Sequence, residues 1–191
     1  ICRAGSRLPI MAMSPLLPDE IPEAVAHGID PSVCDLDFAR ALSAEAQRLD
    51  RPVRFHVEVD TGMGRTGVHL AAAESFLADV CALPGLRLTT LYTHFPDADV
   101  EAPAYARDQV ARFVALRDRL VQRGLEPPRI HAANSAGTVN VPEALLDWVR
   151  VGLIAYGLHP AHDAAHLPLA PVMSFRSRLV QVRDLPAGAT V

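Results

Sequence analysis

The 191-residue chain contains no lysine, because all 18 of its basic residues are arginine. Whatever chemistry these residues support, it cannot use a lysine amine from this chain. The sequence also has no run of 18 apolar residues, so we expect no membrane-spanning helix. The first residues lack the basic and apolar segments of a secretory signal, and we therefore expect no leader peptide.

Charge and cysteine content are also low. A net charge of −4 and a pI near 6 give no basic surface for nucleic acid or an anionic membrane. Cys2, Cys34 and Cys81 are odd in number and far apart, which favours free thiols in a reducing cytoplasm. A nucleophilic role for Cys34 is an alternative, although a small buried side chain is favoured.

A strand that ends in a glycine-containing turn dominates the sequence. Apolar and polar residues alternate through 53–60, which predicts a strand with period 2. The segment Asp-Thr-Gly-Met-Gly follows at 60–64, where glycine permits backbone conformations that other residues resist. Arg65 therefore lies on a tight turn at the carboxyl end of a strand. The plain alternative is an ordinary turn with a solvent-facing arginine.

Strands and helices alternate along most of the chain. The expected strands are 8–13, 29–34, 53–60, 86–95, 129–133 and 149–156. The expected helices are 18–28, 35–50, 70–83, 105–123 and 142–146, with Asp35 as an N-cap. Such alternation predicts an α/β fold with parallel strands and helical crossovers. Six units are too few for a closed eight-stranded barrel, so we predict an incomplete (β/α)₈ TIM-type barrel.

The pattern changes after residue 158. Residues 1–158 form the predicted partial barrel, 159–170 a connector, and 171–191 the start of a second, β-rich domain with a strand at 173–185. His159, His162 and His166 have a spacing that zinc could use on a helix. Flanking prolines favour a solvated loop instead, and we predict no metal site.

Polar residues gather where three of the predicted strands end, namely Arg65, His94, and Asn134 with Ser135. The sixth strand differs, because Arg150 lies near its start and is followed by Gly152 and Leu153. In a (β/α)₈ barrel these ends build the active site, often with a phosphate site after the last strands. Asn134 and Ser135 can donate to phosphate oxygens, and Gly152 lets a backbone N–H come close. Taken singly, His94 could be a core histidine, and Asn134 with Ser135 could cap a helix. Together they indicate a phosphate-bearing ring cofactor.

Four ordered motifs resemble those of the alanine racemases. They are 58–67 (EVDTGMGRTG), 93–99 (THFPDAD), 131–135 (HAANS) and 149–157 (VRVGLIAYG), with further similarity at 171–174 and Gly188. The resemblance implies a pyridoxal-phosphate (PLP) enzyme with a barrel domain, here 1–158, and a C-terminal β-domain. It also implies a head-to-tail homodimer that interconverts L- and D-alanine for peptidoglycan precursors.

The resemblance also assigns roles to individual residues. Arg65 matches the arginine that hydrogen-bonds the cofactor's phenolic oxygen, and His94 the histidine against the pyridine ring. The phosphate contacts match Asn134, Ser135, Gly152 and Leu153. Arg150 matches the arginine that faces the pyridine nitrogen. Because a guanidinium does not lose its proton in proteins, it keeps that nitrogen unprotonated and weakens the ring as an electron sink, which favours racemisation over transamination.

Three departures from the family bear on activity. The family's cofactor lysine lies upstream of residue 1, and the tyrosine base of the partner subunit lies beyond residue 191. We therefore expect the chain to be inactive alone. Glu58 occupies the position of a carbamylated lysine in many members, and we expect it to support Arg65 through a water or a shifted Arg65. The alternatives are a broad-specificity amino-acid racemase or a non-catalytic fragment that binds PLP or phosphate.

Overall fold

All strand pairs among the described residues are parallel. A computed structural model describes residues 5, 7–161 and 167–189. Its strands are β1 (Ile10–Ala12), β2 (Ile29–Pro31), β3 (Val53–Asp60), β4 (Val68–His69), β5 (Leu86–Tyr92), β6 (Ile130–Asn134) and β7 (Trp148–Arg150). β1 pairs with β2, and a second sheet has the order β4-β3-β5-β6-β7. A parallel bridge between Ser32 and His56 connects the two sheets.

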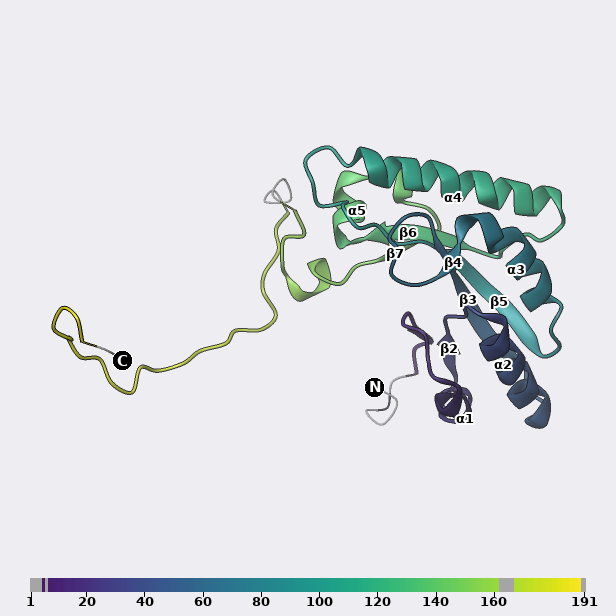
Figure 1. Ribbon diagram of the computed structural model, residues 1–191, viewed down its shortest axis with the longest axis horizontal. Helices are drawn as coiled ribbons and strands as arrows, with labels where there is room; N and C mark the ends of the chain where they lie inside the picture. The colour runs from purple at the N-terminus through teal and green to yellow at the C-terminus, as the bar shows by residue number, and fades with distance from the viewer. Residues whose placement is uncertain (1–4, 6, 162–166, 190–191) are drawn as a thin grey trace.

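The helices are α1 (Ile21–Ala26), α2 (Leu36–Arg48), α3 (Ala73–Cys81), α4 (Ala104–Gln122) and α5 (Ser135–Asn140). Short 3₁₀ turns are η2 (Pro18–Glu20), η3 (Leu70–Ala72), η4 (Pro142–Ala144) and η5 (Ile154–Tyr156). Figure 1 shows the strands side by side, with α2, α3 and α4 along one side of them. The predicted α/β class with a parallel sheet is confirmed, as a partial barrel that does not close among these residues.

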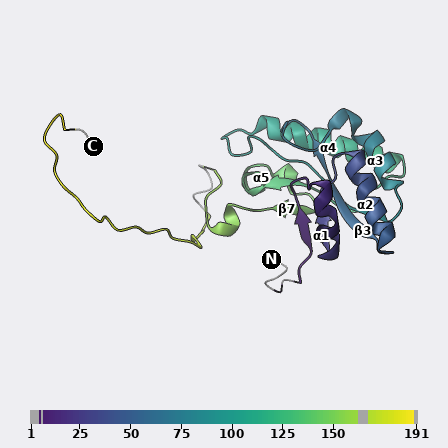
Figure 2. The same ribbon diagram turned by 60° about the horizontal axis from the view of Figure 1, so that its bottom comes forward.

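The helices cover one face of the sheet, and Figure 2 shows the same arrangement from a second side. Phe55, Val57 and Val59 of β3 are fully buried in one apolar cluster. That cluster also contains Leu42 of α2 and Phe113 of α4. Because side chains alternate along a strand, the residues between them point to the opposite, inner face of the sheet.

The inner face carries buried polar side chains instead of the bulky aliphatic layers common in such barrels. These residues are Ser32, His56, Glu58, Thr90, Tyr92 and His131, and none is more than 4% exposed. Since buried polar groups must find hydrogen-bond partners, the interior of this barrel is held together by polar contacts. Its outer layer depends on hydrophobic packing.

The predicted N-cap of α2 is confirmed, whereas three other features of the helices differ from the expectation. Asp35 caps α2, because its carboxylate accepts a hydrogen bond from the backbone N–H of Phe38 at 2.7 Å. Val110, Phe113, Leu116 and Leu120 form the buried side of α4. Leu49, within the expected helix 35–50, lies beyond the end of α2 and is 38% exposed. α5 was not among the expected helices, and the expected helix at 142–146 is the 3₁₀ turn η4.

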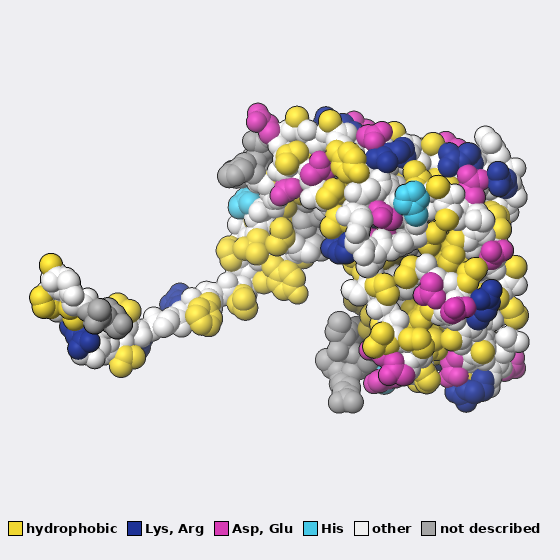
Figure 3. Space-filling view, in the orientation of Figure 1, with side chains coloured by type: hydrophobic (Ala, Val, Ile, Leu, Met, Phe, Trp, Pro, Cys, Tyr) yellow, Lys and Arg dark blue, Asp and Glu magenta, His cyan; other side chains and the backbone are white. Residues whose placement is uncertain are grey.

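The carboxyl end of the chain differs from the expectation. β7 stops at Arg150, and residues 154–156, expected within the last strand, form η5. Residues 173–185, also predicted as a strand, have no strand structure, and they run away from the body of the protein with their hydrophobic side chains exposed (Figure 3). A strand requires a hydrogen-bonded neighbour, and the described residues supply none here. The domain boundaries remain a prediction.

Candidate functional site

Most of the predicted site residues line one cavity. It has a volume of about 360 Å³ and lies at the carboxyl ends of β5, β6 and β7. Its wall includes His94, Asn134, Ser135, Arg150, Gly152 and Leu153. This volume lies within the roughly 300–1,000 Å³ typical of small-molecule sites. The cavity is also at the end of the strands where barrel enzymes place their active sites.

Asn134 and Ser135 have different roles at the junction of β6 and α5. Asn134 is the N-cap of α5, and its side-chain oxygen accepts from the N–H of Gly137 at 2.8 Å. Helix capping, the alternative given for this residue, is therefore what its side chain does. The Ser135 hydroxyl oxygen accepts from the N–H of Gly152 at 2.9 Å. This bond joins the end of β6 to the loop after β7, and it leaves the hydroxyl hydrogen able to donate into the cavity.

Arg150 is fixed by acceptors on three sides. One Nη donates to the backbone oxygens of Thr93 and Ala132 at 2.6 and 2.9 Å, and the other contacts His131 Nδ1 at 2.7 Å. Its guanidinium also lies 5.0 Å from the centre of the Tyr92 ring. The buried Nε has no partner among the described residues. Burial lowers the pKa of Arg150 to about 10, which still leaves it cationic at neutral pH.

His94 is held neutral beside this guanidinium. Its Nδ1 lies 3.3 Å from an Nη of Arg150. Burial, followed by the charges of Arg150 and Arg65, lowers the pKa of His94 to about 4. A neutral imidazole that faces the cavity can stack against a ring or donate one hydrogen bond, but it brings no charge.

Arg65 is separate from this cavity wall. It is exposed, and no hydrogen bond or ion pair joins it to another described residue. Its turn is nevertheless ordered, because Asp60 accepts from the N–H groups of Gly62 and Gly64 at 2.9 and 3.0 Å. Partial burial opposes ionisation of Asp60, yet these backbone bonds lower its pKa overall. Arg65 is thus an exposed side chain on an ordered turn.

Glu58 contacts this turn without touching Arg65. It is buried, and Oε2 accepts from the Thr66 hydroxyl at 2.7 Å and the Tyr92 hydroxyl at 3.4 Å. Gly67, at φ 98°, packs so closely that an added Cβ would lie 2.9 Å from Glu58 Cγ. Within the described residues, the connection from Glu58 to Arg65 therefore passes through Thr66 and the backbone.

Sequence reasoning did not single out Tyr92 or His131. Their rings stack with centres 5.1 Å apart and planes 12° apart, directly behind Arg150. The parallel register pairs the two residues on β5 and β6. The signal was present, since His131 opens the HAANS motif and both residues alternate with apolar neighbours.

The other predicted chemistry has less support in the structure. Cys34 is half-buried and free, and burial raises the pKa of its thiol, which does not favour a nucleophile. His162 and His166 of the considered zinc spacing lie outside the described residues. Of the helices in the described ranges, none has the length and apolar character required to cross a membrane.

Comparison with known proteins agrees with this geometry. The family described as "Alanine racemase, N-terminal domain" matches residues 1–160. The alanine racemase of Desulforamulus reducens is 37% identical over 194 residues, covering 99% of this chain and 52% of its own length. That of Chlorobaculum tepidum is 38% identical over 183 residues, covering 95% and 48%. The chain thus spans about half the length of these curated relatives.

Solved structures give the same result. The alanine racemase of Clostridium difficile 630 in complex with cycloserine aligns with a TM-score of 0.84 at 27% identity, covering 88% of this chain and 47% of that one. The enzyme from D-cycloserine-producing Streptomyces lavendulae aligns with a TM-score of 0.79 at 30% identity, covering 89% and 46%. The matched family domain, the parallel barrel strands and the shared motifs at their carboxyl ends together show that this chain belongs to the alanine racemase family.

Proposed function

We propose that this chain is an internal part of a PLP-dependent alanine racemase that interconverts L- and D-alanine. The observation that carries the proposal is the setting of Arg150. A buried guanidinium, fixed by Thr93, Ala132 and His131, forms one wall of a cavity of ligand size. A ring nitrogen that stays unprotonated favours racemisation over transamination, and a cation at this position supplies that condition.

The residues present fit the cofactor at each of its ends. The Ser135 hydroxyl, whose hydrogen is free to donate, would bind the phosphate together with the loop at Gly152 and Leu153 that lines the cavity. His94 would lie against the cofactor ring, and Arg150 would face the ring nitrogen. The buried Nε of Arg150 has no hydrogen-bond partner among the described residues, which supports a polar atom of the cofactor at this position. PLP, when bound, withdraws electrons from the amino acid and so acidifies its Cα–H.

The chain's own residues bind and orient, and they do not supply the bases. Cationic Arg150 has no lone pair to accept a proton from Cα, and His94, whose pKa is lowered to about 4, is only a weak base at neutral pH. Arg65, on its ordered turn, would reach the phenolic oxygen by a side-chain movement, and Glu58 would hold that turn through Thr66. We assign the cofactor lysine and the opposing tyrosine to parts of the protein outside these 191 residues. The chain alone is then inactive.

The remaining parts of the proposal concern the whole protein. We propose a head-to-tail homodimer in the cytoplasm, in keeping with the family and with the free thiols of Cys34 and Cys81. A broad-specificity racemase is the second candidate, because Glu58 departs from the carbamylated lysine of many members. It would differ in substrate range, not in the role of Arg150.

The test is an assay of the purified full-length protein with added PLP. We expect conversion of L-alanine to D-alanine, measured by chiral chromatography, and much slower conversion of serine, lysine and arginine. Comparable rates with several of these amino acids would favour the broad-specificity enzyme. Absence of any racemisation by PLP-loaded protein would contradict the proposal.

A further inference from the structure

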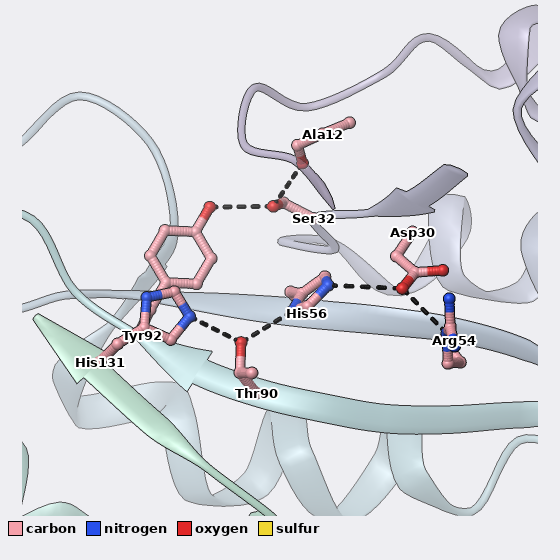
Figure 4. Close-up of polar contacts among 8 residues, drawn as sticks. All are labelled: Ala12, Asp30, Ser32, Arg54, His56, Thr90, Tyr92 and His131. Carbon is pink, nitrogen blue, oxygen red and sulfur yellow. Dashed lines mark hydrogen bonds and ion pairs between the residues drawn. The ribbon is translucent and has the colours of Figure 1, made fainter. Parts of the chain in front are cut away.

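Behind Arg150, three buried side chains continue a hydrogen-bonded chain across the inner face of the sheet. We call Arg150, His131, Thr90 and His56 the interior polar chain. Arg150 Nη1 contacts His131 Nδ1 at 2.7 Å, and His131 Nε2 contacts Thr90 Oγ1 at 2.8 Å. Thr90 Oγ1 then contacts His56 Nδ1 at 2.7 Å. Figure 4 shows the part from His131 to His56, with one residue from each of β6, β5 and β3.

An irregularity in strand pairing makes this alignment possible. β3 and β5 pair Phe55 with Leu88 but His56 with Thr90, so one extra residue of β5 lies between these pairs. Without this bulge, Thr89 would face His56, and Thr90 would point to the other face of the sheet. The bulge therefore places a hydroxyl between two imidazoles that lie on different strands.

The direction of each hydrogen bond follows from the end at Arg150. A guanidinium only donates, so His131 Nδ1 must accept and carries no hydrogen. The single hydrogen of the neutral ring is then on Nε2 and is donated to Thr90. With its oxygen accepting from His131, the Thr90 hydroxyl donates to His56 Nδ1, which leaves the hydrogen of His56 on Nε2. The donor at Arg150 thus determines the tautomers of two histidines.

Both histidines are in the neutral form that this argument needs. Burial, followed by the charge of Arg150, lowers the pKa of His131 to about 3. Burial, followed by the charge of Arg54, lowers the pKa of His56 to about 4. Each ring is at most 2% exposed, so water does not compete for its nitrogens.

At the far end of the interior polar chain, His56 Nε2 is buried and makes no hydrogen bond to another described residue, but a carboxylate lies nearby. His56 Nε2 lies 3.9 Å from a carboxylate oxygen of Asp30, which in turn accepts from Arg54 at 2.9 Å. Asp30 and Arg54 line a second cavity of about 360 Å³ at the opposite ends of the strands. The carboxylate favours the tautomer with hydrogen on Nε2, because that hydrogen points toward a negative charge.

We propose that Thr90 and His56 are positioning residues for Arg150, which act by holding His131 in the tautomer whose Nδ1 accepts from the guanidinium. The inference rests on the proposed function, in which Arg150 faces the cofactor nitrogen. Because Arg150 cannot accept a hydrogen, no proton can leave the interior polar chain through Arg150. The interior polar chain is therefore an orienting device and not a proton path.

His56 supplies the last hydrogen-bond acceptor of the interior polar chain, at a distance from the site. If His56 is replaced by phenylalanine, the Thr90 hydroxyl loses its acceptor and becomes free to donate to His131 Nε2. His131 can then carry its hydrogen on Nδ1, which would place two donors face to face at Arg150. Replacement of Thr90 by valine removes the link itself, whereas serine keeps the hydroxyl.

The test uses full-length protein loaded with PLP and labelled with ¹⁵N-histidine. Long-range ¹H–¹⁵N spectra distinguish protonated from unprotonated ring nitrogens, and a His131→Gln variant assigns the His131 signals. We expect His131 and His56 of the unmodified protein to be neutral with hydrogen on Nε2. In His56→Phe, a second His131 tautomer should appear in the spectra. The kcat of this variant should fall by about tenfold, as is common when an orienting partner is lost. Its KM for alanine should stay within about twofold of that of the unmodified protein.

Three variants complete the design. Thr90→Ser should keep the His131 tautomer and most of the activity, and Thr90→Val should lose both. Ser43→Ala removes a buried hydroxyl, bonded to the Pro84 oxygen on the outer side, and should alter neither. Hydrogen on Nδ1 of His131 in the unmodified protein would overturn the proposal even if every variant failed to fold. So would an unchanged His131 spectrum in folded His56→Phe. Lack of alanine racemisation with the expected tautomers would reject the proposed function alone.

Discussion

The Thr66 hydroxyl donates to the buried carboxylate of Glu58 at 2.7 Å, and this bond connects the barrel interior to the turn that carries Arg65. Arg65 and Thr66 are neighbours in sequence, so the carboxylate fixes the backbone of Arg65 without pairing with its side chain. Among the described residues, no pair joins Glu58 to the Arg65 guanidinium, and the contact lies one residue further along the chain.

Thr66→Val in the full-length protein should loosen this turn. Glu58 Oε2 would keep only the Tyr92 hydroxyl at 3.4 Å. A buried acceptor left without its donor costs about 1–3 kcal/mol, so we expect a decrease of that size in the free energy of unfolding, together with lower kcat. Urea denaturation and steady-state kinetics are the measurements. Thr66→Ser should behave like the unmodified protein, and equal losses in both variants would contradict the role of the hydroxyl.

Glu58→Gln tests the charge of the same contact. The amide oxygen can still accept from Thr66, but the bond is no longer charge-assisted, and charge-assisted bonds contribute on the order of 1.5–3 kcal/mol. We expect lower turnover with little change in circular dichroism. Unchanged steady-state kinetics would show that the negative charge is not required.

Arg150→Lys should be severe although it conserves charge. An ammonium group cannot reach the Thr93 and Ala132 oxygens and His131 at the same time, because it lacks the planar fork of the guanidinium. We expect a drop in kcat of roughly 100-fold or more, as for loss of a preorganised electrostatic contact, and a lower melting temperature. Normal turnover in Arg150→Lys would contradict the proposed role of Arg150 in catalysis. His27→Gln on the exposed end of α1 is a suitable neutral control.

Stability should decrease in mild acid. His56 and His131 have pKa values of about 4 and about 3 in the folded protein, against 6.5 when exposed. Between these values the unfolded chain binds more protons than the folded one. The free energy of unfolding should therefore be constant above pH 6.5 and fall as the pH decreases toward 4. Denaturation at several pH values measures the slope, which should be smaller in His56→Gln and would be absent if the histidines titrated normally.

The 191-residue chain and the full-length protein should differ in their reaction with PLP. After borohydride treatment, we expect no reduced adduct on any side chain of the 191-residue chain, because it contains no lysine. The full-length protein should give an adduct on a lysine outside these residues. Peptide mass spectrometry identifies the site. A side-chain adduct within residues 1–191 would contradict this expectation, whereas reaction at the terminal amine is incidental.

The 191-residue chain should fold poorly when it is expressed by itself. Within the described residues, β1 pairs only with β2 and β7 only with β6, which leaves two open strand edges. Trp148, Val149 and Val151 near one of them are each about 40% exposed. Such edges and apolar patches favour aggregation or a molten state. Co-expression with the preceding segment should restore solubility. A cooperatively unfolding 20.6 kDa monomer in sedimentation and thermal melts would contradict the prediction.

The sequence by itself determined the parallel α/β architecture and the strand ends that carry the site. The alternation at 53–60 predicts β3 with its bounds, and Asp35 predicts the start of α2. These features depend on residues close in sequence, such as a cap three positions from its partner or a side chain that alternates with its neighbour. The motifs around Asn134 and Arg150 were recognisable for the same reason.

The tertiary structure alone decided how these pieces meet. Local pattern could not show that a bulge in β5 aligns Thr90 with His56, because register depends on the partner strand. It could not show that Arg150 contacts His131, 19 positions away, or that residues 173–185 find no partner strand. Hydrogen bonds between strands join residues that are distant in sequence, so the polarity of the barrel interior, and the setting of Arg150 within it, exist only once the strands are assembled side by side.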